Sequence, residues 1–267
     1  MIVSVEGVAI NVATSTLNSD PAYKNLILVH GAANDRNAWR DLMPALVSGN
    51  LNVFAPDLPG HGLSGGSALN SIESIAGWLV ALANALGLKE FALAGHSMGS
   101  LAVLEAAART DRVSRLALLG TSVPMPVSEA LLETARKQPD AACRMVLGWS
   151  HTPSFLLGGG GGHGVWGPGK TLAVMRSNSK TLAGDLSNCN NYKTGLDAAA
   201  TVRCPTLLVL GKRDKMAPLR AVQPLQDALK TVKRCEVADC GHAMMVEKPQ
   251  EVAAALLDFM RQGVERL

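Results

Sequence analysis

The sequence is poor in several features that would mark a specialised environment. Only 4% of its 267 residues are aromatic, and its 25 basic and 22 acidic side chains leave a net charge of only +3. The two signs are interleaved along the chain, so a surface for nucleic acid or another polyanion is not indicated. With 48% hydrophobic and 18% charged residues, a disordered or collagen-like chain is excluded as well.

Long apolar runs and paired cysteines are also missing. The charge-free stretch from Ile75 to Leu88 is too short for a membrane span, which needs about 18 or more apolar residues. The N-terminal segment has no basic start followed by an apolar run, so no secretory signal is predicted. The five cysteines form no CxxC pair and lack the histidine spacing typical of zinc sites. We therefore expect a cytoplasmic protein with reduced thiols, no metal and no membrane partner.

Continuous apolar runs alternate with helical patterns over most of the chain. Six runs are typical of strands buried on both faces of a parallel sheet: residues 25–30, 51–55, 91–94, 116–119, 206–210 and 233–237. Alternating residues near the N-terminus predict two further short strands around a turn. Helical spacing separates the runs, as in Ile72, Ile75 and Leu79. The predicted fold class is α/β, with a mainly parallel sheet covered on both faces.

One segment interrupts this alternation. Residues 122–195 contain no clear buried strand, but they hold a helical pattern at Glu129–Lys137 and a glycine-rich stretch at Gly158–Gly169. An insertion after a strand would cover the sheet edge at which α/β folds bind ligands. We therefore expect a core formed by residues 1–121 and 196–267, and a cap formed by residues 122–195. A decorative loop is the alternative.

A nucleophile motif follows one of the predicted strands. The segment Gly95-His96-Ser97-Met98-Gly99 lies between a buried run and a helical pattern, which is the strand, turn and helix that G-x-S-x-G requires. Small flanking residues allow a strained turn that lifts the serine hydroxyl, and a helix N-terminus favours negative charge beside it. This context predicts a nucleophilic Ser97, with an ordinary glycine-rich turn as the alternative.

A serine hydroxyl needs a base, and the base needs an orienting acid. Of the six histidines, His242 lies in the loop between the last predicted strand and the final helix, at the sheet edge expected to carry Ser97. Asp214 follows the buried run of residues 206–210 at the same edge and is the preferred acid. Asp239 is the rival, but its nearness in sequence to His242 makes a well-directed contact harder.

An intermediate formed at the serine would carry an oxyanion that needs about two backbone donors. We expect these donors to be the N–H groups of Met98, next to the nucleophile, and of Ala32, in the turn after the first buried run. His30 would hold that turn by hydrogen bonds. Pocket candidates come from this turn, the aromatic residues of the cap and the methionines near the catalytic loops, although packing explains them nearly as well: Ala33, Trp149, Trp166, Met216 and Met244.

These motifs resemble those of the α/β-hydrolase superfamily, and more loosely its small bacterial serine esterases. The resemblance rests on five segments in the expected order: His30 to Ala33, Asp57 to Ser64, Gly95 to Gly99, Leu210 to Asp214 and Gly241-His242. It implies a core of about eight strands, a Ser97-Asp214-His242 triad, no cofactor and a variable cap after the sixth strand that selects the substrate. We expect a monomer or homodimer that cleaves small, uncharged or weakly polar carboxylic esters through an acyl-serine.

Other activities use the same machinery. A lactonase, a thioesterase or a C–C bond hydrolase needs the same three side chains, and a ligand receptor can retain them. A serine at this turn argues against haloalkane dehalogenases and epoxide hydrolases, which resemble the fold but carry an aspartate there.

Overall fold

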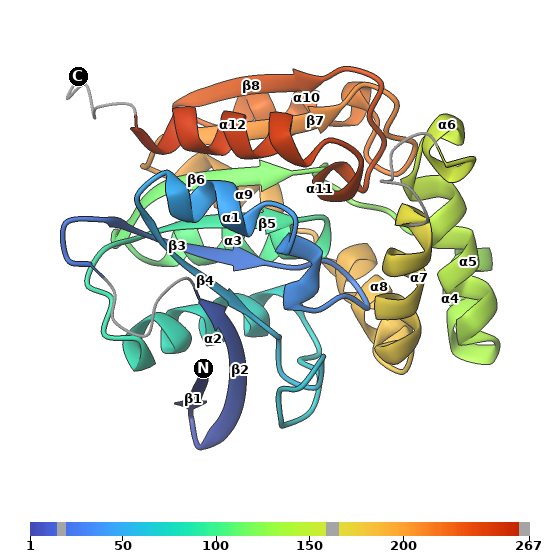
Figure 1. The fold of residues 1–267 in the computed structure, drawn as a ribbon, viewed down its shortest axis with the longest axis horizontal. Coiled ribbons are helices and arrows are strands. Elements are labelled where there is room, and N and C mark those ends of the chain that lie inside the picture. Colours follow the sequence, from blue (N-terminus) through green and yellow to red (C-terminus); the bar gives the residue numbers. More distant parts are fainter. Residues whose placement is uncertain (15–19, 159–165, 262–267) are drawn as a thin grey trace.

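The computed structural model describes residues 1–14, 20–158 and 166–261. Within these ranges eight strands form one sheet: β1 (Ile2–Val5), β2 (Val8–Thr14), β3 (Lys24–Val29), β4 (Leu51–Pro56), β5 (Phe91–His96), β6 (Val113–Leu119), β7 (Thr206–Gly211) and β8 (Val232–Val237). Their order is β1-β2-β4-β3-β5-β6-β7-β8 (Figure 1). β2 pairs antiparallel with β1 and β4, and all other neighbours are parallel. The predicted α/β class is confirmed, and all six runs form strands. The expected burial of residues 233–237 is wrong: β8 is an edge strand, and of its residues only Val237 is buried.

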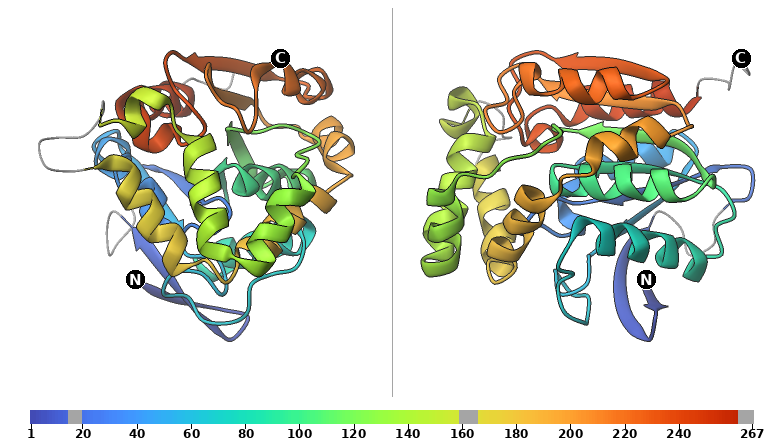
Figure 2. Two further views of the ribbon diagram at one scale, coloured as in Figure 1. Left: turned by 90° about the vertical axis from the view of Figure 1, so that its right-hand side faces the viewer. Right: turned by 180° about the vertical axis from the view of Figure 1, so that it is seen from behind.

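Helices cover both faces of this sheet (Figures 1 and 2). One face carries α1 (Met43–Ser48) and α12 (Pro249–Arg261), and the other carries α2 (Ile72–Ala85), α3 (Met98–Arg109), α9 (Gly195–Thr201) and α10 (Gln223–Ala228). Successive side chains of a strand point to opposite faces, so Leu26 and Leu28 pack in one core and Ile27 and Val29 in the other. Burial on both faces explains why the central strands are mostly apolar rather than alternating.

Five helices occupy the segment between β6 and β7: α4 (Glu129–Lys137), α5 (Pro139–Ser150), α6 (Pro153–Leu156), α7 (Gly167–Ser177) and α8 (Leu182–Asn191). We call α4–α8 the helical insertion. They lie together beyond the carboxyl edge of the sheet (Figure 2, left) and enclose an apolar cluster of their own, which includes Leu131, Leu147 and Leu182. Of the glycine-rich stretch, Gly167 begins α7, and residues 159–165 lie outside the described ranges.

Short elements at the same edge complete the fold. They are the 3-10 helices η1 (Arg36–Trp39) and η2 (Leu219–Ala221) and the one-turn helix α11 (Met244–Glu247). The loops that follow β3, β5, β7 and β8 therefore open towards the helical insertion (Figure 1). None of the helices in the described ranges combines the length and apolar character needed to cross a membrane.

Candidate active site

Ser97 occupies a sharp turn between β5 and α3. Its backbone has φ 53° and ψ −121°, a conformation that a residue with a side chain adopts only under constraint. The flanking glycines allow the constraint: a Cβ on Gly95 would lie 2.2 Å from the Gly99 carbonyl oxygen, and one on Gly99 would lie 2.3 Å from that of Val29. Only glycine permits such close backbone packing, so β3, β5 and α3 together fix Ser97 at the carboxyl edge of the sheet.

The His242 imidazole, in the loop after β8, contacts Asp214, in the loop after β7. His242 Nδ1 lies 2.8 Å from Asp214 Oδ2, and both side chains are buried. Because an ionised carboxylate only accepts hydrogen bonds, the proton of the neutral ring lies on Nδ1, and Nε2 then has the free lone pair. Nε2 has no hydrogen-bond partner among the described residues. The ring therefore offers a free basic nitrogen.

Asp214 is held in its charged form. Burial opposes ionisation, but the attraction of His242 and hydrogen bonds from its imidazole and from two backbone N–H groups lower the pKa of the carboxyl. These N–H groups belong to Met216 and Ala217 and lie 2.8 and 2.9 Å from Oδ1. The rival acid, Asp239, is exposed and pairs with Arg213 at 2.8 Å. The structure thus brings Asp214, and not Asp239, to the imidazole.

Two further buried histidines support the surrounding loops. His96 donates from Nε2 to the carbonyl oxygen of His242 at 2.9 Å. His30 donates from Nδ1 to the Gly31 carbonyl oxygen at 2.9 Å and accepts at Nε2 from the Leu58 N–H at 3.1 Å. Burial lowers the pKa of both imidazoles to about 3, so both are neutral at pH 7. They hold loops in place and are not available as bases.

The turn after β3 lies against Ser97. A Cβ on Gly31 would lie 3.2 Å from Ser97 Cβ. Ala32 lines the same cavity as Ser97, whereas Met98 is fully buried as the first residue of α3. Neither the Ala32 nor the Met98 N–H donates a hydrogen bond to any acceptor in the described ranges. Both amides are therefore free to bind a further oxygen.

A cavity of about 250 Å³ opens beside Ser97 and His242. Much of its wall comes from apolar side chains of the helical insertion: Leu131, Val146, Trp149, Val174, Met175, Leu182 and Leu186. Exposed basic residues also border it, namely Arg40, Lys170 and Lys215. The core thus contributes Ser97 and His242 to the cavity, and the insertion contributes an apolar wall.

The five expected pocket residues divide between this cavity and other places. Trp149 and Met216 line it. Ala33 and Met244 are fully buried in the apolar clusters, and Trp166 is half exposed and donates its indole N–H to a backbone carbonyl at 3.0 Å. Apart from Trp149, the lining residues of α5, α7 and α8 were missed, and the helical periodicity of these segments is the signal that could have revealed them.

The helical insertion is hydrogen-bonded to the loop that carries His242. The Ala243 N–H donates to the Ser150 carbonyl oxygen at 2.8 Å. Glu247, on α11, accepts from the Gly241 N–H at 3.1 Å and from Thr152 Oγ1 at 2.6 Å. Burial raises the pKa of this carboxyl despite these hydrogen bonds. The Glu247 side chain therefore joins the residue before His242 to the N-terminus of α6.

Comparison with known proteins identifies the family of the chain. The model of the alpha/beta hydrolase family matches residues 26–255. The chain belongs to this family. Among curated relatives, the pimeloyl-[acyl-carrier protein] methyl ester esterase of Aromatoleum aromaticum is 29% identical over 253 residues, which cover 89% of this chain and 98% of that protein.

Solved structures of other alpha/beta hydrolases share the fold. A thermophilic esterase from Thermogutta terrifontis has a TM-score of 0.83 and 21% identity, covering 98% of this chain and 97% of that one. An enol-lactonase from Burkholderia xenovorans LB400 has the same TM-score and identity, covering 98% of this chain and all of that one. At such identities the likeness concerns the fold, which the sequence motifs had already indicated.

Three buried histidines should make this alpha/beta hydrolase sensitive to acid. Burial lowers the pKa of His30 and His96 to about 3 and that of His151 to about 4, from 6.5 for a free imidazole. At a pH between the folded and the unfolded pKa of each histidine, only the unfolded chain binds a proton there. The free energy of unfolding therefore falls as the pH drops below about 6.5. Each histidine contributes up to about 1.4 kcal/mol per pH unit in that window.

Urea unfolding followed by tryptophan fluorescence at about pH 7 and about pH 5 measures this loss. His151→Gln serves as the internal comparison, because its amide can replace the hydrogen bond from Nδ1 to the Leu147 carbonyl oxygen at 3.0 Å. We expect a smaller pH dependence in this variant than in the wild type. The stabilisation that comes from the lowered pKa of Asp214 is lost only below the pKa of an unfolded aspartate carboxyl, about 3.9, so it does not affect this comparison. Equal stability at the two pH values would contradict the assignment of neutral buried histidines.

Proposed function

We propose that this alpha/beta hydrolase cleaves small carboxylic esters through an acyl-enzyme at Ser97, with His242 as base and Asp214 as its orienting acid. The observation that carries the proposal is the 2.8 Å contact between His242 Nδ1 and Asp214 Oδ2, which leaves Nε2 free beside a cavity that Ser97 also lines. The named activity of the Aromatoleum relative, a methyl ester esterase, supports an ester as the substrate.

The proposed reaction follows from the protons that these groups can hold. His242 Nε2 accepts the hydroxyl proton as Ser97 Oγ attacks the ester carbonyl, and Asp214 stabilises the imidazolium that forms. The free N–H groups of Ala32 and Met98 bind the oxyanion. His242 then protonates the leaving alcohol, and water repeats the sequence to release the acid. These groups supply every proton transfer, so the proposed mechanism calls for no cofactor.

The apolar wall of the helical insertion is proposed to hold the acyl group. A volume of about 250 Å³ is just below the range of roughly 300–1,000 Å³ for drug-sized ligands, which favours short and medium acyl chains. We keep the sequence-based expectation of a cytoplasmic monomer or homodimer acting on uncharged or weakly polar esters. A lactonase, a thioesterase or a C–C bond hydrolase would use the same three side chains.

The test combines a substrate panel with covalent labelling. We expect turnover of p-nitrophenyl acetate, butyrate and octanoate to exceed that of the palmitate ester, whose chain is too long for the cavity. A fluorophosphonate should add once per chain, on the peptide that contains Ser97, as read by mass spectrometry. A matched succinate ester tests whether the basic residues at the cavity border favour a carboxylate. Absence of turnover for esters, lactones and thioesters alike, with labelling elsewhere, would sink the proposal and favour a ligand receptor.

A further inference from the structure

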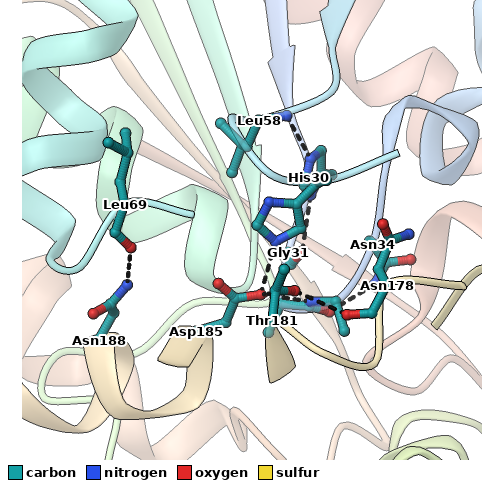
Figure 3. A network of polar contacts seen from close by, with 12 residues as sticks. His30, Gly31, Asn34, Leu58, Leu69, Asn178, Thr181, Asp185 and Asn188 are labelled. Carbon is teal, nitrogen blue, oxygen red and sulfur yellow. Dashed lines mark hydrogen bonds and ion pairs between the residues drawn. The ribbon is translucent and has the colours of Figure 1, made fainter. Parts of the chain in front are cut away.

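A buried carboxylate of the helical insertion contacts the turn that carries the proposed oxyanion donor. Asp185, on α8, is 2% exposed. Its Oδ2 accepts from the Ala33 N–H at 2.9 Å, from Thr181 Oγ1 at 3.0 Å and from His61 Nε2 at 2.9 Å (Figure 3). Three donors on one buried oxygen make this a fixed contact, and only one of them, Thr181, belongs to the insertion itself.

The turn has a backbone geometry that needs such a partner. The Asn34 N–H donates to the Gly31 carbonyl oxygen at 3.2 Å, so Ala32 and Ala33 are the two central residues of a turn. Ala33 has φ +49°, whereas Ala32 is not in the left-handed region. This pattern is that of a type II turn, which normally places glycine or asparagine at the second central position. An alanine there is disfavoured unless its surroundings impose the conformation.

Both ends of the central peptide group are held. Its N–H, from Ala33, donates to Asp185, and its carbonyl, from Ala32, accepts from Asn34 Nδ2 at 3.1 Å. Type I and type II turns differ by a flip of this central peptide group. The two hydrogen bonds therefore select the observed orientation of the central peptide group. The Ala32 N–H belongs to the preceding peptide group, which such a flip does not turn, but it is carried by the residue whose carbonyl these hydrogen bonds hold.

The carboxylate is itself held by a charged partner from the core. His61 Nε2 faces Asp185, and Nδ1 faces the Pro59 carbonyl oxygen at 3.0 Å. Both neighbours are acceptors, so both ring nitrogens carry hydrogen and the imidazole is a cation. Burial opposes this charge, but the hydrogen bond and the negative charge of Asp185, helped by Asp57, raise the pKa of His61. The adjacent His30 ring, 5.1 Å away between centroids, is neutral.

We propose that Asp185 is a positioning residue for the reaction: held by His61, its carboxylate fixes the Ala32–Ala33 peptide group and so keeps the turn that carries the Ala32 N–H in place beside the oxyanion. The inference rests on the proposed ester hydrolysis and deepens it. It assigns to the helical insertion a part in transition-state stabilisation, besides its part in binding the acyl group. The core alone does not complete the oxyanion site.

A variant without the Asp185 carboxylate tests whether this residue positions the turn or only contributes to folding. In Asp185→Ala the Ala33 N–H loses its acceptor, and the turn can relax to negative φ. We expect kcat for p-nitrophenyl butyrate to fall by about 10–100-fold, less than the roughly 100–1,000-fold for complete loss of an oxyanion donor, with KM changed by less than about threefold. Asp185→Asn keeps an oxygen acceptor for the amide and should retain most of kcat.

A glycine at the strained position provides the rescue. Glycine adopts positive φ without steric cost, so it should hold the type II turn without the carboxylate. The loss in each case is the decrease in log kcat caused by Asp185→Ala, measured in the wild type and in Ala33→Gly. We expect this decrease in the Ala33→Gly background to be at most about half of that in the wild type. A purely structural role for the carboxylate gives no reason for a glycine elsewhere to restore turnover.

A control on the same helix removes a different contact with the core. Asn188 Nδ2 donates to the Leu69 carbonyl oxygen at 2.9 Å, away from the turn (Figure 3). Asn188→Ala should change kcat by less than about threefold, since it leaves the turn intact. An unchanged kcat in Asp185→Ala, or a double variant no faster than Asp185→Ala, would overturn the positioning role. If Ser97→Ala also remains active, the proposed function itself fails, and the two failures are thereby distinguished.

Discussion

Ser97→Ala is expected to lower kcat/KM for p-nitrophenyl butyrate by roughly 10⁴–10⁶-fold. Without Oγ no acyl-enzyme can form, and only oxyanion binding and substrate positioning remain. His242→Ala should cost a similar factor, because the other unpaired ring nitrogen beside the cavity within the described ranges, His96 Nδ1, belongs to an imidazole whose pKa burial lowers to about 3. The double variant should be no slower than either single one, since residues that act as one unit give strongly non-additive effects.

The measurement uses steady-state kinetics with each variant purified separately from the wild type. Thermal unfolding provides the folding control, and the substitution should leave the melting temperature nearly unchanged because alanine occupies the same space without the hydroxyl. A Ser97→Ala protein that kept more than a few per cent of the wild-type rate would show that the nucleophile is elsewhere.

Asp214→Asn is expected to reduce kcat by roughly 10³–10⁴-fold while the fold stays intact. An amide in this place is neutral, so it cannot stabilise the imidazolium, and it can donate to Nδ1 and thereby move the ring proton to Nε2. Nε2 would then no longer accept the proton of Ser97. The large effect follows from the wrong tautomer rather than from a lost contact.

Asp239→Asn is the matched control, since it makes the same chemical change three residues before the base. Asp239 is exposed and pairs with Arg213, so kcat should change by less than about threefold. The comparison is read from the pH profiles of kcat of the two variants and the wild type. Full activity in Asp214→Asn, together with a strong loss in Asp239→Asn, would reverse the assignment of the acid.

The sequence predicts the sheet and the candidate triad for physical reasons that are local. Strands buried on both faces are mostly apolar on both sides, and β3, β5 and β7 are visible as apolar runs for that reason. Parallel strands bring their carboxyl ends to one edge, so loops after them converge even when they are far apart in the chain. Ser97, Asp214 and His242 each follow such a strand, and their meeting place is a consequence of topology.

The wall of the cavity is harder to predict. It is made by helices whose rotation about their own axes depends on packing against each other, and sequence gives that rotation only approximately. Trp149 faces the cavity, while Trp166, which was expected beside it, bonds to a backbone carbonyl outside the lining. Nothing in the sequence around an aromatic residue of the cap shows whether its side chain will line the cavity or pack outside it.

The contact between His61 and Asp185 could not be predicted at all. The two residues are 124 positions apart. His61 lies in a recognisable glycine-rich turn, but Asp185 looks like an ordinary polar residue of an amphipathic helix. Its burial results from the docking of α8 onto the core, and the hydrophobic periodicity of the helix does not predict that docking.

The two hydrogen-bonded junctions between the helical insertion and the catalytic loops limit how the enzyme can be re-engineered. One joins Asp185 to the turn after β3, and the other joins Ser150 and Thr152 to the loop and helix around the base. A chimaera that exchanges the whole insertion with that of a relative also exchanges one half of each junction. Grafts that retain residues 150–152 and 181–185 and vary the helix faces between them alter the acyl site while leaving both junctions in place.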